Sequence, residues 1–202
     1  MMVQHPPMLG LSIAAVLLAA WGTVTIANAA EQNYAAPFVL TSATFQDGGL
    51  VPLRMAFTKD ANNPDCLGEN ISPQLAWAGV RPGVKSFAIT MFEMEDPPHT
   101  DLVIYGIPAT VSMFAEGELS KPSAKFVGGR NYRNLPTWRG MCPPPHEGPY
   151  RTAIHHYQFT IWGTDLDPMQ LLPGLTADEL QEKLNGHIKG KALLIARFQR
   201  PE

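Results

Sequence analysis

The chain has 202 residues, a formal net charge of −3 at pH 7 and a hydrophobic content of 45%. This length suits one domain with a sizeable core, and the small negative charge argues against broad binding to nucleic acid or to anionic lipid. Any anion therefore has to be bound by a local pocket.

The N-terminus begins with an apolar run over residues 9–26, and residues 27–29 (ANA) have the small-x-small pattern that signal peptidase cleaves. We predict that residues 1–29 form a signal peptide, that residues 30–202 form a single domain, and that the protein is periplasmic or secreted. An uncleaved membrane anchor is the alternative, because about 18 apolar residues can span a bilayer and no Lys or Arg precedes them.

Cys66 and Cys142 are the only cysteines in the sequence. Exported proteins fold in an oxidising compartment, so a disulfide between them is our first hypothesis. The same reasoning argues against Cys142 as a nucleophile with His155 as its base. The sequence also lacks G-x-S-x-G, H-E-x-x-H and C-x-x-C, so it carries no strong hydrolase or metal signature. We expect no enzymatic activity and no cofactor.

Nineteen prolines and seventeen glycines divide the chain into short segments, as in a mainly β domain with two layers and long loops. Residues 86–92 and 102–107 are apolar on both faces and are predicted to be central strands. Residues 72–77 and 127–140 lack a period and are expected to be ordered loops. The full set of predicted strands is 38–40, 45–46, 54–57, 86–92, 102–107, 156–163 and 192–198.

The clearest helix pattern lies in TADELQEKLNGHI. Thr176 can cap the first turn and Glu179 completes a capping box, while Leu180, Leu184 and Ile188 repeat every four residues. We predict a helix that packs against the domain by one apolar stripe.

A period of two in HHYQFTIWG places His155, Tyr157, Phe159 and Ile161 on one face of a strand. His155 and Tyr157 therefore point in the same direction at the start of an otherwise apolar face. Their side chains are either part of a binding site or a hydrogen-bonded pair that closes the core.

A second group of polar residues lies in MFEMEDPPHTDLVIYGIP. Glu93 and Glu95 follow a buried strand, and His99 and Asp101 share a face as the chain enters the next strand after a turn that contains Pro97. Carboxylates and imidazoles at the ends of central strands can shift the pKa values of one another or hold a cation. A solvated loop is the alternative.

Seven segments follow one another along the chain: FVLTSATFQDGGLVP, GENISPQLAW, SFAITMFEMEDPP, LVIYGIP, GMCPPP, HHYQFTIWGTD and LTADELQEKLNGHIKGKALLIARF. Their order resembles the sequence pattern of the phosphatidylethanolamine-binding protein family, in the branch of bacterial proteins similar to Raf kinase inhibitor protein. The resemblance covers about residues 38–198 without a segment out of order. It implies a large antiparallel sheet packed with a smaller sheet, a C-terminal helix and strand, and a small pocket for phosphate-like anions and phospholipid headgroups.

In the family the pocket is built from a D-P-D-A-P segment, a histidine that opens an H-W strand, a G-x-C-P-P loop and an H-R-Y strand. Pro143 and Pro144 match the loop and would form a pocket wall. His155 and Tyr157 match the last strand and would hydrogen-bond the ligand, with His156 in place of the arginine.

The first two segments depart from the family pattern. EMEDP at residues 93–97 keeps both acids of D-P-D-A-P as glutamates, and Asp101 stands where the family has its strand-opening histidine. Two unpaired carboxylates oppose an oxyanion by several kcal/mol at an effective dielectric near 20. His99 lies two residues before Asp101 on the same face and is one candidate to replace the missing imidazole. His146 and Arg151, from the proline-rich loop, are the others.

We therefore expect an exported binding protein for a phosphate-like anion, a phospholipid headgroup or another small polar ligand. A divalent-cation site built from Glu93, Glu95, Asp101 and a histidine is the alternative, although arginines at positions 130, 139 and 151 compete for the same acids. A protein–protein regulator of the kinase-inhibitor type is a third reading. A homodimer is left open, and we expect no nucleic-acid partner and no membrane span after signal cleavage. The expected ligand-binding residues are Glu93, Glu95, Pro97, His99, Asp101, Pro143, Pro144, His155 and Tyr157.

Overall fold

A computed structural model describes residues 1–2, 36–62, 64–95, 98–143 and 154–201 of the chain. Its contacts group Ala35–Glu202 into one compact unit. Nearly all of the predicted signal peptide lies outside the described residues, as do Pro97, Pro144, His146 and Arg151. None of the helices in the described ranges is long and apolar enough to cross a membrane.

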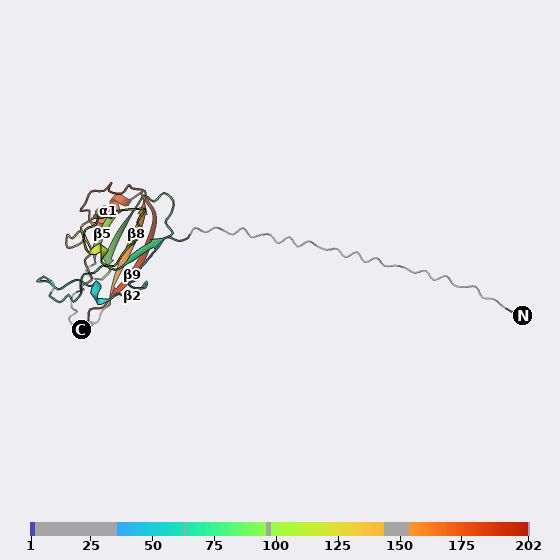
Figure 1. Cartoon of the computed structure of the whole chain (residues 1–202), viewed down its shortest axis with the longest axis horizontal. Coiled ribbons are helices and arrows are strands. Elements are labelled where there is room, and N and C mark those ends of the chain that lie inside the picture. Colours follow the sequence, from blue (N-terminus) through green and yellow to red (C-terminus); the bar gives the residue numbers. More distant parts are fainter. Residues whose placement is uncertain (3–35, 63, 96–97, 144–153, 202) are drawn as a thin grey trace. The chain divides into compact units, whose positions relative to one another are not determined.

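Two β-sheets form the frame of this unit (Figure 1). The larger sheet has six strands in the order β2-β9-β8-β4-β5-β7, and its neighbours are antiparallel except for β2 and β9. The smaller sheet is antiparallel, in the order β1-β3-β6. The strands are β1 Val39–Thr41, β2 Gly49–Leu50, β3 Leu75–Ala78, β4 Ser86–Glu93, β5 His99–Pro108, β6 Met113–Phe114, β7 Val127–Gly128, β8 His155–Thr164 and β9 Ile188–Phe198; the helices are α1 Ala177–Leu184 and the 3-10 turns η1 Leu53–Met55 and η2 Glu118–Ser120.

The main core lies between the two sheets, and a second apolar layer lies between the large sheet and α1. Strand β8 shows the expected alternation, because Tyr157, Phe159 and Ile161 belong to the main core while Trp162 belongs to the second layer. Strand β4 supplies side chains to both, which explains why its sequence is apolar on both faces. The predicted fold class is confirmed.

Helix α1 follows the predicted capping pattern at its start. The hydroxyl of Thr176 accepts from the backbone N–H of Glu179, and the Glu179 carboxylate accepts from the backbone N–H of Thr176. The helix ends at Leu184, however, so the expectation that Ile188 belongs to it was wrong. Gly186 adopts a positive φ of 82° after the helix, and Ile188 begins β9.

The shortest elements were the ones predicted wrongly. Residues 45–46 form no strand, residues 54–57 overlap the 3-10 turn η1, and the loop expected at residues 72–77 contains the start of β3. The loop expected at residues 127–140 begins with β7, and strands β2 and β6 were not predicted at all. A strand of two to four residues is too short to show a period of two in the sequence, and its formation depends on pairing with neighbouring strands.

A β-bulge in β5 positions the polar end of this strand. Met91 pairs with Leu102 and Phe92 with Thr100, so Asp101 is an extra residue on β5 without a partner position on β4. A bulge shifts the pairing register by one residue, so that the side chains beyond it lie on the opposite side of the sheet from that in a regular strand. As a result His99 lies directly opposite Glu93.

Candidate functional site

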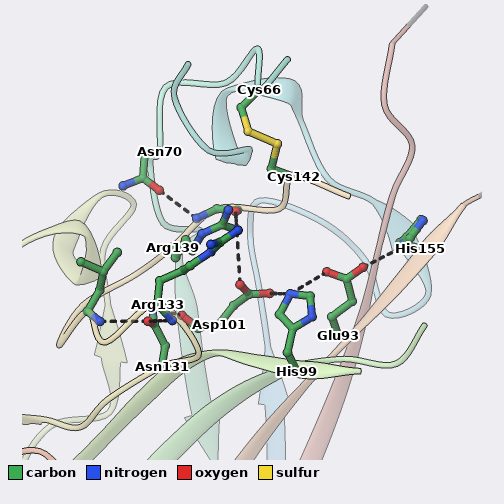
Figure 2. Close-up of polar contacts among 12 residues, drawn as sticks. Cys66, Asn70, Glu93, His99, Asp101, Asn131, Arg133, Arg139, Cys142 and His155 are labelled. Carbon is green, nitrogen blue, oxygen red and sulfur yellow. Dashed lines mark hydrogen bonds and ion pairs between the residues drawn. A yellow bond between two sulfur atoms is a disulfide. The ribbon is translucent and has the colours of Figure 1, made fainter. Parts of the chain in front are cut away.

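Three strands of the large sheet bring their polar ends together at one place (Figure 2). Glu93 ends β4, His99 begins β5 and His155 begins β8, and Glu93 pairs across the sheet with His99 on one side and Tyr157 on the other. We call Glu93, His99, Asp101, His155 and Tyr157 the Glu93 cluster. Each of the five was expected to bind ligand, and the structure brings all of them together.

Glu93 is buried at the centre of the cluster and contacts an imidazole with each carboxylate oxygen. Its Oε1 lies 2.5 Å from His155 Nδ1, and its Oε2 lies 3.2 Å from His99 Nε2. Burial alone would raise the pKa of Glu93, but the hydrogen bonds with His155 and His99 outweigh it and bring the pKa to about 2. Glu93 is therefore an anion at neutral pH whose charge the two imidazoles can offset.

Tyr157 lies beside Glu93 and is fully buried. Within the described part of the chain its hydroxyl meets no acceptor at good hydrogen-bond geometry, although its proximity helps to lower the pKa of Glu93. Burial and the negative charge of Glu93 raise the pKa of Tyr157 far above its ordinary value. Tyr157 is thus a neutral phenol whose O–H is available as a donor.

Asp101 has no solvent exposure and sits between an imidazole and a guanidinium. Its Oδ2 lies 3.7 Å from His99 Nε2, and its Oδ1 lies 3.5 Å from Arg139 Nη1. Burial raises the pKa of the Asp101 carboxyl to about 7, even though the charges of His99 and Arg139 act in the opposite direction. Near neutral pH the group therefore exchanges between acid and carboxylate.

Arg139 is buried as deeply as the acid that it faces, with 2% of its surface exposed. Its guanidinium carbon lies 4.6 Å from the ring centre of Phe57 and 4.9 Å from that of Tyr132, and it donates to the carbonyl of Gly140 at 3.2 Å. Sequence reasoning named Arg139 only as a competitor for the acids. Its pairing with Asp101 depends on a contact between distant segments, which no local pattern signals.

The segment that carries Arg139 is fixed by several close contacts. Cys142 forms the predicted disulfide with Cys66, with 5.6 Å between their Cα atoms (Figure 2). The backbone N–H of Gly140 donates to Asn70 Oδ1 at 2.8 Å, and a Cβ atom at Gly140 would lie only 2.2 Å from the carbonyl oxygen of Met55. The chain can pass this closely only because residue 140 is glycine.

Glu95 lies at the edge of the cluster and has a different partner. Its carboxylate accepts from the backbone N–H of His156 at 2.7 Å and lies 2.7 Å from His156 Nδ1, while His155 Nδ1 is 4.0 Å away. The Glu93–His155 and Glu95–His156 pairs together fasten the end of β4 to the start of β8. Pro143 is buried, and its role as a pocket wall stays a prediction.

His99 connects the cluster to the surface. Its side chain is 21% exposed and its ring packs against that of Tyr132, with 4.0 Å between the ring centres. His99 and Tyr132 also line an open groove of about 280 Å³ together with Phe92, Thr100, Arg130 and Thr176. Among the residues that the structure describes, Glu93, Asp101, His155 and Tyr157 are not part of this groove's lining.

The geometry defines a β-sheet protein with a buried site of acids and imidazoles at the end of its large sheet. The family model for phosphatidylethanolamine-binding proteins matches residues 41–199. A UPF0098 protein from Methanothermobacter thermautotrophicus is 32% identical over 165 residues, which cover 80% of this chain and 98% of that protein. The chain belongs to the phosphatidylethanolamine-binding protein family.

Solved structures agree with this assignment. The crystal structure of Escherichia coli YbcL, described as a member of the mammalian PEBP family, has a TM-score of 0.68 at 26% identity and covers 81% of this chain and 98% of its own. A putative PEBP homologue from Chlamydia trachomatis has a TM-score of 0.67 at 25% identity and covers 82% and 99%. The family predicted from the sequence is confirmed.

Proposed function

We propose that the protein is an exported, non-catalytic binding protein whose Glu93 cluster takes a phosphate-like anion, either free or as a phospholipid headgroup. The observation that carries this proposal is the position of Glu93 between His99 and His155. The name of the matching family supports a phospholipid as the source of the anion. The export signal predicted from the sequence and the Cys66–Cys142 disulfide are both compatible with an oxidising compartment.

The charges of the cluster are more favourable to an anion than the sequence suggested. We expected two unpaired carboxylates, but Glu93 contacts two imidazoles and Asp101 lies between His99 and Arg139. Because the pKa of Asp101 is about 7, this group can be a neutral acid that donates to an oxyanion. The hydroxyl of Tyr157 and the imidazoles are further donors.

Calorimetry with the full protein tests this proposal. We expect phosphate and phosphoethanolamine to bind saturably at pH 6.5 in the presence of a chelator, and His155→Gln to weaken binding at least tenfold, because a charge-assisted hydrogen bond contributes about 1.5–3 kcal/mol. His187→Gln is the matched control, since His187 pairs with Asp165 at 2.7 Å, outside the cluster.

Absence of saturable binding at millimolar ligand, in protein shown to be folded by circular dichroism, would contradict the proposal. Tighter binding of phosphoethanolamine than of phosphate would identify a headgroup as the ligand, and equal binding would identify the free anion. A kinase-type regulatory role, a lipid partner and a homodimer stay predictions.

A further inference from the structure

We propose that Glu93, His99 and Asp101 also form a site for a zinc-type divalent transition-metal ion. These residues offer one imidazole nitrogen and two carboxylate oxygens that all lie within 4.8 Å of one another. The inference does not depend on anion binding, because it is argued from the identity and spacing of the metal-donor atoms.

The distances between the donor atoms fit one tetrahedral ion. Zinc bonds of about 2.0–2.2 Å at tetrahedral angles place neighbouring donors roughly 3.3–3.6 Å apart. His99 Nε2 lies 3.2 Å from Glu93 Oε2 and 3.7 Å from Asp101 Oδ2. Both separations from His99 Nε2 are therefore close to those of a tetrahedral ion, and the whole set lies within 4.8 Å.

Asp101 supplies a second, independent observation. Its carboxylate is completely buried, and neither oxygen makes a hydrogen bond within the described part of the chain. The ion pairs at 3.5 and 3.7 Å are longer than hydrogen bonds. A buried carboxylate in this state costs free energy, and a metal ion bound at Oδ2 would satisfy it.

The surrounding residues hold the three donors in place, as outer-shell partners of metal ligands do. Arg139 faces the second oxygen of Asp101, and His155 contacts the second oxygen of Glu93. The ring of Tyr132 packs against that of His99 (4.0 Å between centres). His99 is the donor of the three that reaches the surface, with 21% of its side chain exposed.

A rival donor set shares Glu93 with this one. Glu93, Glu95 and His155 also lie within 4.8 Å of one another. The 2.5 Å separation of Glu93 Oε1 and His155 Nδ1 is shorter than the roughly 3.3–3.6 Å between neighbouring donors of one tetrahedral zinc ion, and Glu95 already accepts from His156. The set with His99 and Asp101 is therefore favoured. One imidazole beside two carboxylates suits zinc or cobalt rather than calcium or magnesium, which prefer oxygen ligands alone.

The test uses full protein without an affinity tag, stripped with a chelator and kept in phosphate-free buffer. Calorimetry should show one zinc ion per chain, and Co²⁺ should give the absorption bands of a tetrahedral site. We expect Asp101→Asn and His99→Gln each to weaken zinc binding at least tenfold. Glu95→Gln and His156→Gln should leave it unchanged, and circular dichroism checks that each variant is folded.

Three results would overturn the inference. The first is that the folded wild type binds no stoichiometric zinc. The second is that Glu95→Gln loses zinc while Asp101→Asn retains it. The third is that none of the four variants changes zinc binding. Asp101→Asn keeps the shape of the side chain, so it remains decisive if His99→Gln fails to fold. Because anion binding is measured in chelator, the failure of one proposal leaves the other standing.

Discussion

Glu93 and Asp101 are buried carboxyl groups of the same site, and their surroundings shift their pKa values in opposite directions. Glu93 contacts two imidazoles, and its pKa falls to about 2. This group stabilises the fold above the ordinary pKa of a glutamate, and the contribution is lost as pH falls toward 2. Asp101 has more distant partners, so burial prevails and its pKa rises to about 7.

Asp101 affects stability with the opposite pH dependence to Glu93, and the Asp101→Asn variant tests this. Between pH 3.8 and about 7 the unfolded chain has released a proton that the folded protein keeps, so the free energy of unfolding falls as pH rises. Relative to Asp101→Asn, the free energy of unfolding of the wild type should fall by about 3 kcal/mol between pH 5 and pH 8. Denaturant unfolding at pH 5, 6, 7 and 8 measures this difference, and parallel pH profiles of the two proteins would show that Asp101 titrates normally.

At the scale of elements, two local features build the site. Val103 faces α1, and in a regular strand His99, four residues earlier, would face the same side. The bulge in β5 reverses this, so that the His99 side chain lies on the same side of the sheet as Glu93. The segment around Gly140 carries Arg139 and is fastened by the disulfide and by Asn70. The two features place Asp101 and its cation opposite one another.

Gly140→Ala should damage both stability and binding. The added Cβ would meet backbone atoms of Met55 and Ala56, which cannot move aside like a flexible side chain. We expect a loss of about 1–3 kcal/mol in the free energy of unfolding and weaker anion binding, measured by denaturant unfolding and calorimetry. Gly48→Ala is the control, because Gly48 has φ +69° but open space around it. It should lose stability and keep its anion affinity; equal anion binding by both variants would contradict the assigned role of this segment.

At the scale of the whole molecule, the long strands β4, β5 and β8 and the capping box of α1 could be predicted because each has a clear sequence period or cap. The short strands β2, β3, β6 and β7 could not be predicted, because their formation depends on pairing with neighbouring strands. Within the site, period two correctly grouped His155 with Tyr157. The bulge at Asp101 and the approach of Arg139 could not be predicted, because both arise from contacts between segments distant in the sequence.

The central claim is that an oxyanion binds between the imidazoles of the Glu93 cluster. Titration of ¹⁵N-histidine-labelled protein with phosphate, in chelator and followed by NMR of the ring resonances, tests it most directly. We predict saturable shifts of the His99 and His155 rings, assigned by His→Gln substitution, with no shift of His187. Unchanged His99 and His155 resonances at millimolar phosphate would contradict the account.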